Sequence, residues 1–307
     1  MAKISNSQKY SHLFSAIFDG VKTGSVIWLD DLLGSETLPN VSIATKKKYL
    51  REYVDSNPTA LEKLLGFYPS ANTIVSLVEL KLEKPITEIE LYEANNVARE
   101  IVKNITEPIL ENFLTNSLSQ FVSDKSIQIP IQNMMDFLQQ DFTEFLAKSG
   151  NGLVSIAGTV NEQLLQRAME NSGMTDSEFQ RTGKNSDADF KIYSSSTNRY
   201  QIGVEVKSYH ARERLLRGLQ DIEGYKVGFG YFVDASEFNA HRTQTLLQSE
   251  AAAIYMPQVT LDKVEATAKE MTTNQRIAFG SRFYRPIECF VSDMKYFCKM
   301  GNLPAFT

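Results

Sequence analysis

The chain has 307 residues, of which 42% are hydrophobic and 22% are charged, and its formal net charge is −5. These values describe an ordinary globular protein with one large or two ordinary domains. No signal-peptide pattern and no run of the ~20 apolar residues needed to span a membrane is visible, so we expect a cytoplasmic protein without a membrane partner. The two cysteines, Cys289 and Cys298, lack the spacing of zinc ligands, and we expect reduced thiols.

The first half of the sequence is predicted to be mainly helical. Residues 87–90 (Thr-Glu-Ile-Glu) have the pattern of a capping box, and an apolar stripe at near-helical spacing follows. This stripe comprises Ile89, Val97, Ile101 and Ile105. Pro108 is expected to end or restart that helix, because proline cannot donate a backbone hydrogen bond.

Two further apolar stripes are interpreted as buried core or a dimer interface. They comprise Ile109, Leu110, Phe113, Leu114, Leu118 and Phe121, then Met134, Leu138, Phe142, Phe145 and Leu146. A cluster of helix-breaking residues at 148–153 marks the favoured domain boundary. We therefore expect a mainly helical region at 1–150, for dimerisation or DNA recognition, and a second domain with a C-terminal extension at 151–307.

After the breaker cluster the sequence alternates between short strands and helices, which is typical of an α/β or α+β fold. The predicted elements are a helix at 161–169, a strand at 177–183, a hairpin at 188–207, a helix at 210–223 and a strand at 226–234. The helix at 210–223 is polar and rich in arginine. The sequence thus predicts the order αβββαβ for this region.

Three charged residues mark the predicted hairpin. Side chains two positions apart on a strand point to one face, so Glu205 and Lys207 project together. If the two strands pair, Asp189 lies beside Glu205. Two carboxylates and one ammonium would then meet, which suits a hard divalent cation and a nearby water or phosphate. The alternative is a solvated cross-strand ion pair of Glu205 and Lys207, worth only a few tenths of a kcal/mol.

Asp189, fifteen intervening residues and then Glu205-Val206-Lys207 resemble the signature of the PD-(D/E)xK nuclease superfamily. The αβββαβ order also resembles that superfamily's core, and the resemblance covers roughly residues 155–260. It implies a restriction-endonuclease-like core with a mixed central sheet. Ala188 stands where the motif often has proline, which leaves open whether Asp187 or Asp189 is the ligand. We favour Asp189, because it directly begins the alternating run.

The resemblance also implies roles for single residues. Asp189, Glu205 and the Val206 carbonyl would hold Mg²⁺, and Lys207 would orient or deprotonate the attacking water. Glu162, early in the leading helix, stands where many members place an additional acid facing the metal. Its alternative role is that of a carboxylate favoured by the helix dipole.

The implied function is that of a Mg²⁺-dependent type II restriction endonuclease, which cuts a short sequence in double-stranded DNA as a homodimer. A cognate DNA methyltransferase would act on the same site without forming a complex. The alternatives are another nuclease of this superfamily (repair, junction-resolving or nonspecific defence) and a DNA-binding or assembly protein without catalysis. The three histidines of the chain do not supply an HNH site, and no Walker A or nucleophile-elbow motif occurs.

Two groups of arginines are candidates for DNA contacts. Arg212, Arg214 and Arg217 lie on the helix after the hairpin, where phosphate contacts or solvated side chains are expected and base readout is possible. Arg276, Arg282 and Arg285 occur with Phe283 and Tyr284, which could grip a backbone or stack on bases. The alternative for this second group is a surface loop with core aromatics.

Overall fold

The computed structural model describes residues 5–34, 41–118, 122–123, 126–127, 151–183, 186–196, 200–209, 212–274 and 282–305. The chain divides into two compact units. The first comprises residues 1–81 and 97–157, and the second comprises residues 82–96 and 158–307. The division between these units falls after residue 157, inside a helix, where the sequence interpretation placed a boundary after residue 150. Residues 82–96, from the first half of the sequence, belong to the second unit.

The first unit is mainly helical, as predicted. Its elements before residue 97 are α1 (Asn6–Gly20), β1 (Ile27–Trp28), α2 (Leu29–Gly34), α3 (Ile43–Ser56), η1 (Pro58–Lys63), β2 (Leu64–Leu65) and α4 (Ala71–Leu82). β1 and β2 pair in parallel, and a second small pair joins β3 (Val122–Ser123) to β4 (Ser126–Ile127). Phe14 and Phe18 of α1 pack with Tyr53 of α3, which joins these two helices through aromatic contacts.

The long helix α5 (Leu91–Leu118) corrects two details of the sequence interpretation. Pro108 neither ends nor restarts the helix but lies inside it. The Glu90 carboxylate accepts the Thr87 backbone N–H at 3.2 Å, which is one half of a capping box. Because α5 begins at Leu91, Ile89 precedes it and is 73% exposed, whereas Ile101 and Ile105 are buried as predicted. The stripe from Met134 to Leu146 lies outside the described residues.

The second unit contains a six-stranded mixed sheet, which confirms the mixed α/β fold class. The strands are β5 (Phe179–Arg181), β6 (Phe190–Tyr193), β7 (Gln201–Lys207), β8 (Lys226–Gly230), β9 (Ala253–Met256) and β10 (Tyr284–Pro286). Their order is β10-β9-β8-β7-β6-β5. Pairing is antiparallel from β5 to β7 and parallel from β7 to β10.

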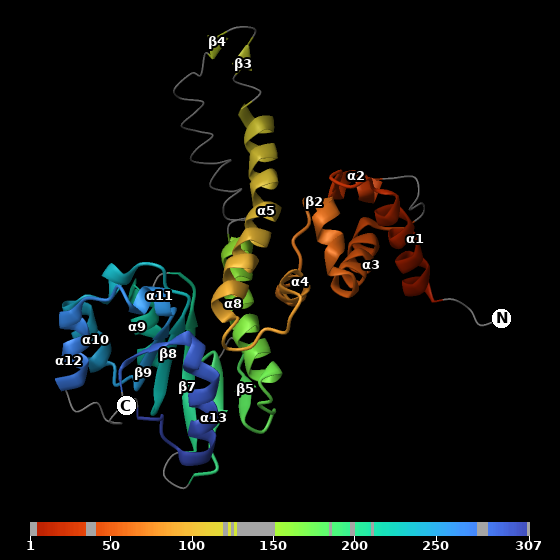
Figure 1. The fold of residues 1–307 in the computed structure, drawn as a ribbon. Coiled ribbons are helices and arrows are strands. Elements are labelled where there is room, and N and C mark those ends of the chain that lie inside the picture. The colour runs from red at the N-terminus through yellow and green to blue at the C-terminus, as the bar shows by residue number, and fades with distance from the viewer. Residues whose placement is uncertain are drawn as a thin grey trace. The chain divides into compact units, whose positions relative to one another are not determined.

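Helices complete the second unit around this sheet (Figure 1). They are α8 (Asn151–Asn171), α9 (Arg212–Asp221), η5 (Ala235–Phe238), α10 (Ala240–Gln248), α11 (Gln258–Leu261), α12 (Ala266–Asn274), η6 (Ile287–Cys289) and α13 (Phe290–Met300). The elements α8, β5, β6, β7, α9 and β8 follow one another in the predicted αβββαβ order. The first and last predicted strands are shorter than expected: residues 177–178 and 182–183 lie outside β5, and residues 231–234 lie outside β8.

The two faces of the sheet are covered by different helices. On one face, a Cβ added to Gly228 of β8 would meet the Leu215 side chain of α9 at 3.0 Å, so glycine permits this close approach. Leu215 belongs to a core cluster that also contains residues of α10 and α12. On the other face, Phe290 of α13 packs edge-to-face against Phe229 and Tyr255. Apolar packing on both faces thus fixes the strands that carry the predicted site.

Candidate functional site

The hairpin of β6 and β7 brings Asp189 next to Glu205. Phe190 pairs with Val204 in the antiparallel register, so the two carboxylates occupy the next position along the strands. The Asp189 backbone N–H donates to the Val204 carbonyl at 3.0 Å. Its Oδ2 accepts the Val206 N–H at 2.7 Å, which holds this carboxylate against the backbone near the end of β7. The juxtaposition predicted from strand alternation is therefore present.

Glu205 is a buried carboxylate with a raised pKa. The residue is only 7% exposed, and its pKa is raised from 4.5 to about 7. Burial is the largest cause and the neighbouring Asp189 charge adds to it, whereas the Lys207 ammonium opposes the shift by donating a hydrogen bond to Glu205 Oε1. The cluster thus contains two carboxyl groups and one ammonium at the end of β7, and Glu205 is its buried member.

The chemistry of this cluster fits a hard divalent cation. Two adjacent carboxylates supply oxygen ligands, and a cation between them would offset the repulsion that raises the Glu205 pKa. The N–H and C=O of one residue point to the same side of an extended strand, so the Val206 carbonyl faces the edge where Asp189 is bound. Within the described ranges, no group of three or more His, Cys, Asp or Glu side chains is placed to hold a metal.

Asp187 and Asp189 have different partners. The Asp187 carboxylate forms an ion pair with Lys191 at 3.0 Å. Burial alone would raise the pKa of Asp187, but the hydrogen bonds from Lys191 and Ser186 outweigh it and lower this pKa. Asp189 instead faces the strand that carries Glu205. The geometry therefore favours Asp189 as the ligand of the pair.

The structure does not bring Glu162 together with the two carboxylates of the hairpin. Glu162 lies on α8, and its Oε2 accepts hydrogen bonds from the Arg181 guanidinium of β5, at 3.2 Å from Nε. Both side chains are about one quarter exposed. Pairing of Glu162 with Arg181 is a local contact between α8 and β5, and its simplest consequence is to tie the leading helix to the edge of the sheet.

A pocket adjoins the cluster on the side of Lys207. It has a volume of about 770 Å³ and is lined by Lys207, Ser208, Glu213, Arg214, Ser236, Glu237, Asn239 and Arg242. Arg214 is therefore placed beside the cluster, whereas Arg217 is exposed elsewhere on α9. Arg212 begins α9, and its side chain is not among those described. The sequence interpretation did not select Arg242. The one local signal for it is Asn239, a helix-capping residue three positions before it.

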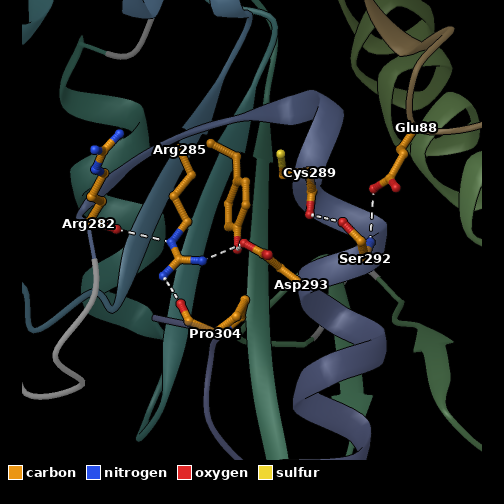
Figure 2. Close-up of polar contacts among 8 residues, drawn as sticks. Glu88, Arg282, Arg285, Cys289, Ser292, Asp293 and Pro304 are labelled. Atoms are coloured by element: carbon orange, nitrogen blue, oxygen red, sulfur yellow. Dashed lines mark hydrogen bonds and ion pairs between the residues drawn. The ribbon is translucent and has the colours of Figure 1, made fainter. Parts of the chain in front are cut away.

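The DNA contact expected of the second group of arginines is corrected for Arg285. Its side chain is fully buried, and its guanidinium donates to Asp293 Oδ2 at 2.5 Å and to the Pro304 carbonyl at 2.8 Å (Figure 2). DNA cannot reach this group, so the expected contact is wrong for Arg285. Phe283 and Tyr284 are also buried and belong to the core rather than to a stacking surface. Arg282 is exposed, and Arg276 lies outside the described residues.

Comparisons with protein-family models, with curated proteins and with solved structures found no match to this chain. Within the described part of the chain, no helix is both long enough and apolar enough to cross a membrane.

Proposed function

We propose that this protein is a Mg²⁺-dependent endodeoxyribonuclease of the PD-(D/E)xK type. The observation that carries the proposal is the meeting of Asp189, Glu205 and Lys207 at the end of the β6–β7 hairpin. A surface ion pair would leave Glu205 solvated, whereas this carboxylate is 7% exposed and lies against a second acid. Burial of Glu205 beside a second acid costs stability, so a role that needs both carboxylates is favoured.

The residues of the cluster would have different roles in metal binding and catalysis. Asp189 and Glu205 would hold Mg²⁺, which supplies Lewis-acid activation of water and charge neutralisation at the phosphate when bound. The Val206 N–H fixes the Asp189 carboxylate, and Gly218 of α9 leaves room for the Glu205 carboxylate. Lys207 would exchange its contact with Glu205 for the attacking water or the scissile phosphate. Its positive charge would stabilise the charge that develops in the transition state.

Within this class, we propose a type II restriction enzyme that cuts a short double-stranded sequence. A homodimer would match the two-fold symmetry of a palindromic site. The helical first unit would serve dimerisation or DNA recognition, and a methyltransferase of the same specificity would protect the host DNA.

The test is incubation of the purified protein with phage DNA in Mg²⁺ and, in parallel, in EDTA. Discrete bands that require Mg²⁺ are expected, whereas a smear would indicate a nonspecific nuclease of the same chemistry. Asp189→Ala and Glu205→Ala should each abolish cleavage while DNA binding in Ca²⁺ persists. DNA that stays intact under every metal condition would exclude the nuclease and favour a binding or assembly protein.

A further inference from the structure

The pocket beside Lys207 lies where α/β proteins commonly bind ligands. It is formed by the carboxyl end of β7, the first turn of α9, the turn η5 and the start of α10. Ligands of open α/β sheets bind outside the carboxyl ends of the parallel strands. Lys207 belongs to both the carboxylate cluster and the lining of this pocket. A group held in the pocket is therefore adjacent to the place where Lys207 would act.

Arg242 has the features of a ligand-binding arginine. It is half-buried in the wall of the pocket. Among the described residues, no ion pair or side-chain hydrogen bond occupies its guanidinium. A partly desolvated guanidinium without a partner favours a planar or multidentate anion, because its donors are arranged as a rigid fork.

The backbone around Arg242 is held in place by local hydrogen bonds. Asn239 caps α10, and its Oδ1 accepts the Arg242 N–H at 3.0 Å. Asp234 caps the preceding turn η5 by accepting the Ser236 N–H at 2.9 Å. These caps fix the first turn of α10 and thus the direction from which Arg242 enters the pocket.

The charges of the pocket are mixed. Lys207, Arg214 and Arg242 contribute three cations to the lining, whereas Glu213 and Glu237 contribute two carboxylates. Glu213 is exposed in the first turn of α9, where the helix dipole stabilises its negative charge. The remaining polar groups, Ser208, Ser236 and Asn239, can donate hydrogen bonds. The described lining residues therefore offer an anion several donors and a small net positive charge.

We propose that this pocket binds a phosphate of the nucleic-acid backbone next to the scissile phosphate, and that Arg242 is its principal contact, with Arg214 as a second. This inference rests on the proposed function, because it takes the substrate to be a nucleic acid strand that passes Lys207. It goes beyond that function by assigning a binding residue on α10, outside the hairpin and the helix α9. The role is sequence-independent, since phosphates carry no base identity.

The test measures the salt dependence of DNA binding by the full chain in Ca²⁺, with a fluorescent DNA duplex as the probe. Loss of one phosphate contact should lower the slope of log Kd against log salt by about 1 and weaken binding by about tenfold at moderate salt. Arg242→Gln should have this effect, whereas Arg242→Lys should keep the slope because it keeps the charge. Lys299→Gln is the matched control, since Lys299 is exposed on α13, which covers the opposite face of the sheet.

The outcomes separate the inference from the proposed function. A wild-type slope for Arg242→Gln, in a protein that cleaves DNA, overturns the inference alone. Equal weakening in Arg242→Gln and Arg242→Lys, together with a lower Tm, assigns Arg242 a structural role and also overturns it. A reduced slope in a protein that never cleaves DNA supports the pocket and refutes the nuclease. A wild-type protein that does not bind DNA at all refutes both.

Discussion

Gly218 of α9 lies directly over the Glu205 carboxylate, and a Cβ at this position would overlap the carboxylate atoms. Any larger residue here would therefore force the Glu205 side chain or α9 to shift, and glycine inside a helix costs up to about 1 kcal/mol relative to alanine. This close approach also contributes to the burial that raises the Glu205 pKa to about 7. One position of α9 thus links helix packing to the electrostatics of the candidate site.

Gly218→Ala should reduce cleavage strongly, because Glu205 or α9 must move to admit the methyl group. Gly158 is the matched control, since it lies inside α8 and a Cβ there would meet nothing within 4 Å. Gly158→Ala should leave cleavage unchanged and stabilise the protein by roughly 0.5–1 kcal/mol. Cleavage rates and urea unfolding curves of both variants test this, and equal activity of the two would show that Glu205 tolerates displacement.

The raised pKa of Glu205 predicts how the stability of the metal-free protein depends on pH. Because the folded-state pKa of about 7 exceeds the ordinary value of 4.5, the folded protein binds more protons than the unfolded chain between these values. This contribution to stability is therefore complete below pH 4.5 and is lost as the pH rises through 7. The shift corresponds to roughly 3 kcal/mol as an upper estimate.

Glu205→Gln should remove that dependence. In EDTA, the free energy of unfolding of the variant should rise relative to that of the wild type when the pH is raised from 5 to 8. Most of the Glu205 titration falls between these two pH values. Urea unfolding at both pH values measures the difference, and comparison of the two proteins cancels the other titrating groups. A constant difference between the variant and the wild type would mean that Glu205 titrates near its ordinary pKa.

Asp187 and Asp189 should respond differently to the same substitution. Asp187→Asn removes an ion pair with Lys191, whereas Asp189→Asn alters the carboxylate bound to the Val206 N–H. We expect Asp187→Asn to retain more cleavage activity, since only Asp189 lies against Glu205. Single-turnover rates in Mg²⁺ compare the two, and the reverse order would assign the ligand role to Asp187.

The hairpin could be predicted from the sequence because its information is local. Period-2 alternation sets which side chains share a face, so Asp189 could be placed beside Glu205 once the two strands were taken to pair as a hairpin. The same reasoning gave the order of elements from α8 to β8. It failed at the strand ends, since hydrogen bonds to neighbouring strands decide where a strand stops.

Residues whose contacts depend on how separate elements pack together could not be assigned in this way. Arg285 looked like part of a basic aromatic loop, but its guanidinium contacts Asp293 of α13 and the carbonyls of Arg282 and Pro304. Arg242 enters the pocket only because the crossover from β8 to β9 places α10 beside the end of β7. Glu162 likewise meets Arg181 through the packing of α8 on the sheet edge.

The buried pair of Arg285 and Asp293 predicts a defect of stability rather than of DNA binding (Figure 2). Arg285→Met should lower the free energy of unfolding by about 3–5 kcal/mol, because it leaves the Asp293 carboxylate buried without its cation. The double variant Arg285→Met/Asp293→Asn should recover part of this loss. At a temperature where Arg285→Met is folded, the salt dependence of its DNA binding should match the wild type. A reduced slope would restore Arg285 as a DNA contact.

Lys207 distinguishes a catalytic site from a buried Glu205 carboxylate that only needs a neutralising charge. Its ammonium contacts Glu205 and also lines the pocket, so it can reach both the carboxylates and a bound phosphate. Lys207→Ala leaves Asp189 and Glu205 in place, and DNA binding in Ca²⁺ should change little. The transition state would lose a positive charge that the ground state uses less, which typically costs ~3–4 kcal/mol, or about 10²–10³-fold in rate.

Lys191 supplies the control for this last variant, because it lies on the neighbouring strand β6 and pairs with Asp187. Lys191→Ala removes the same charge from the same hairpin but should leave single-turnover cleavage within a few-fold of wild type. Rates are measured at saturating enzyme so that binding does not contribute. If Lys207→Ala and Lys191→Ala cleave equally fast, the ammonium of Lys207 serves only to neutralise Glu205, and the catalytic assignment fails.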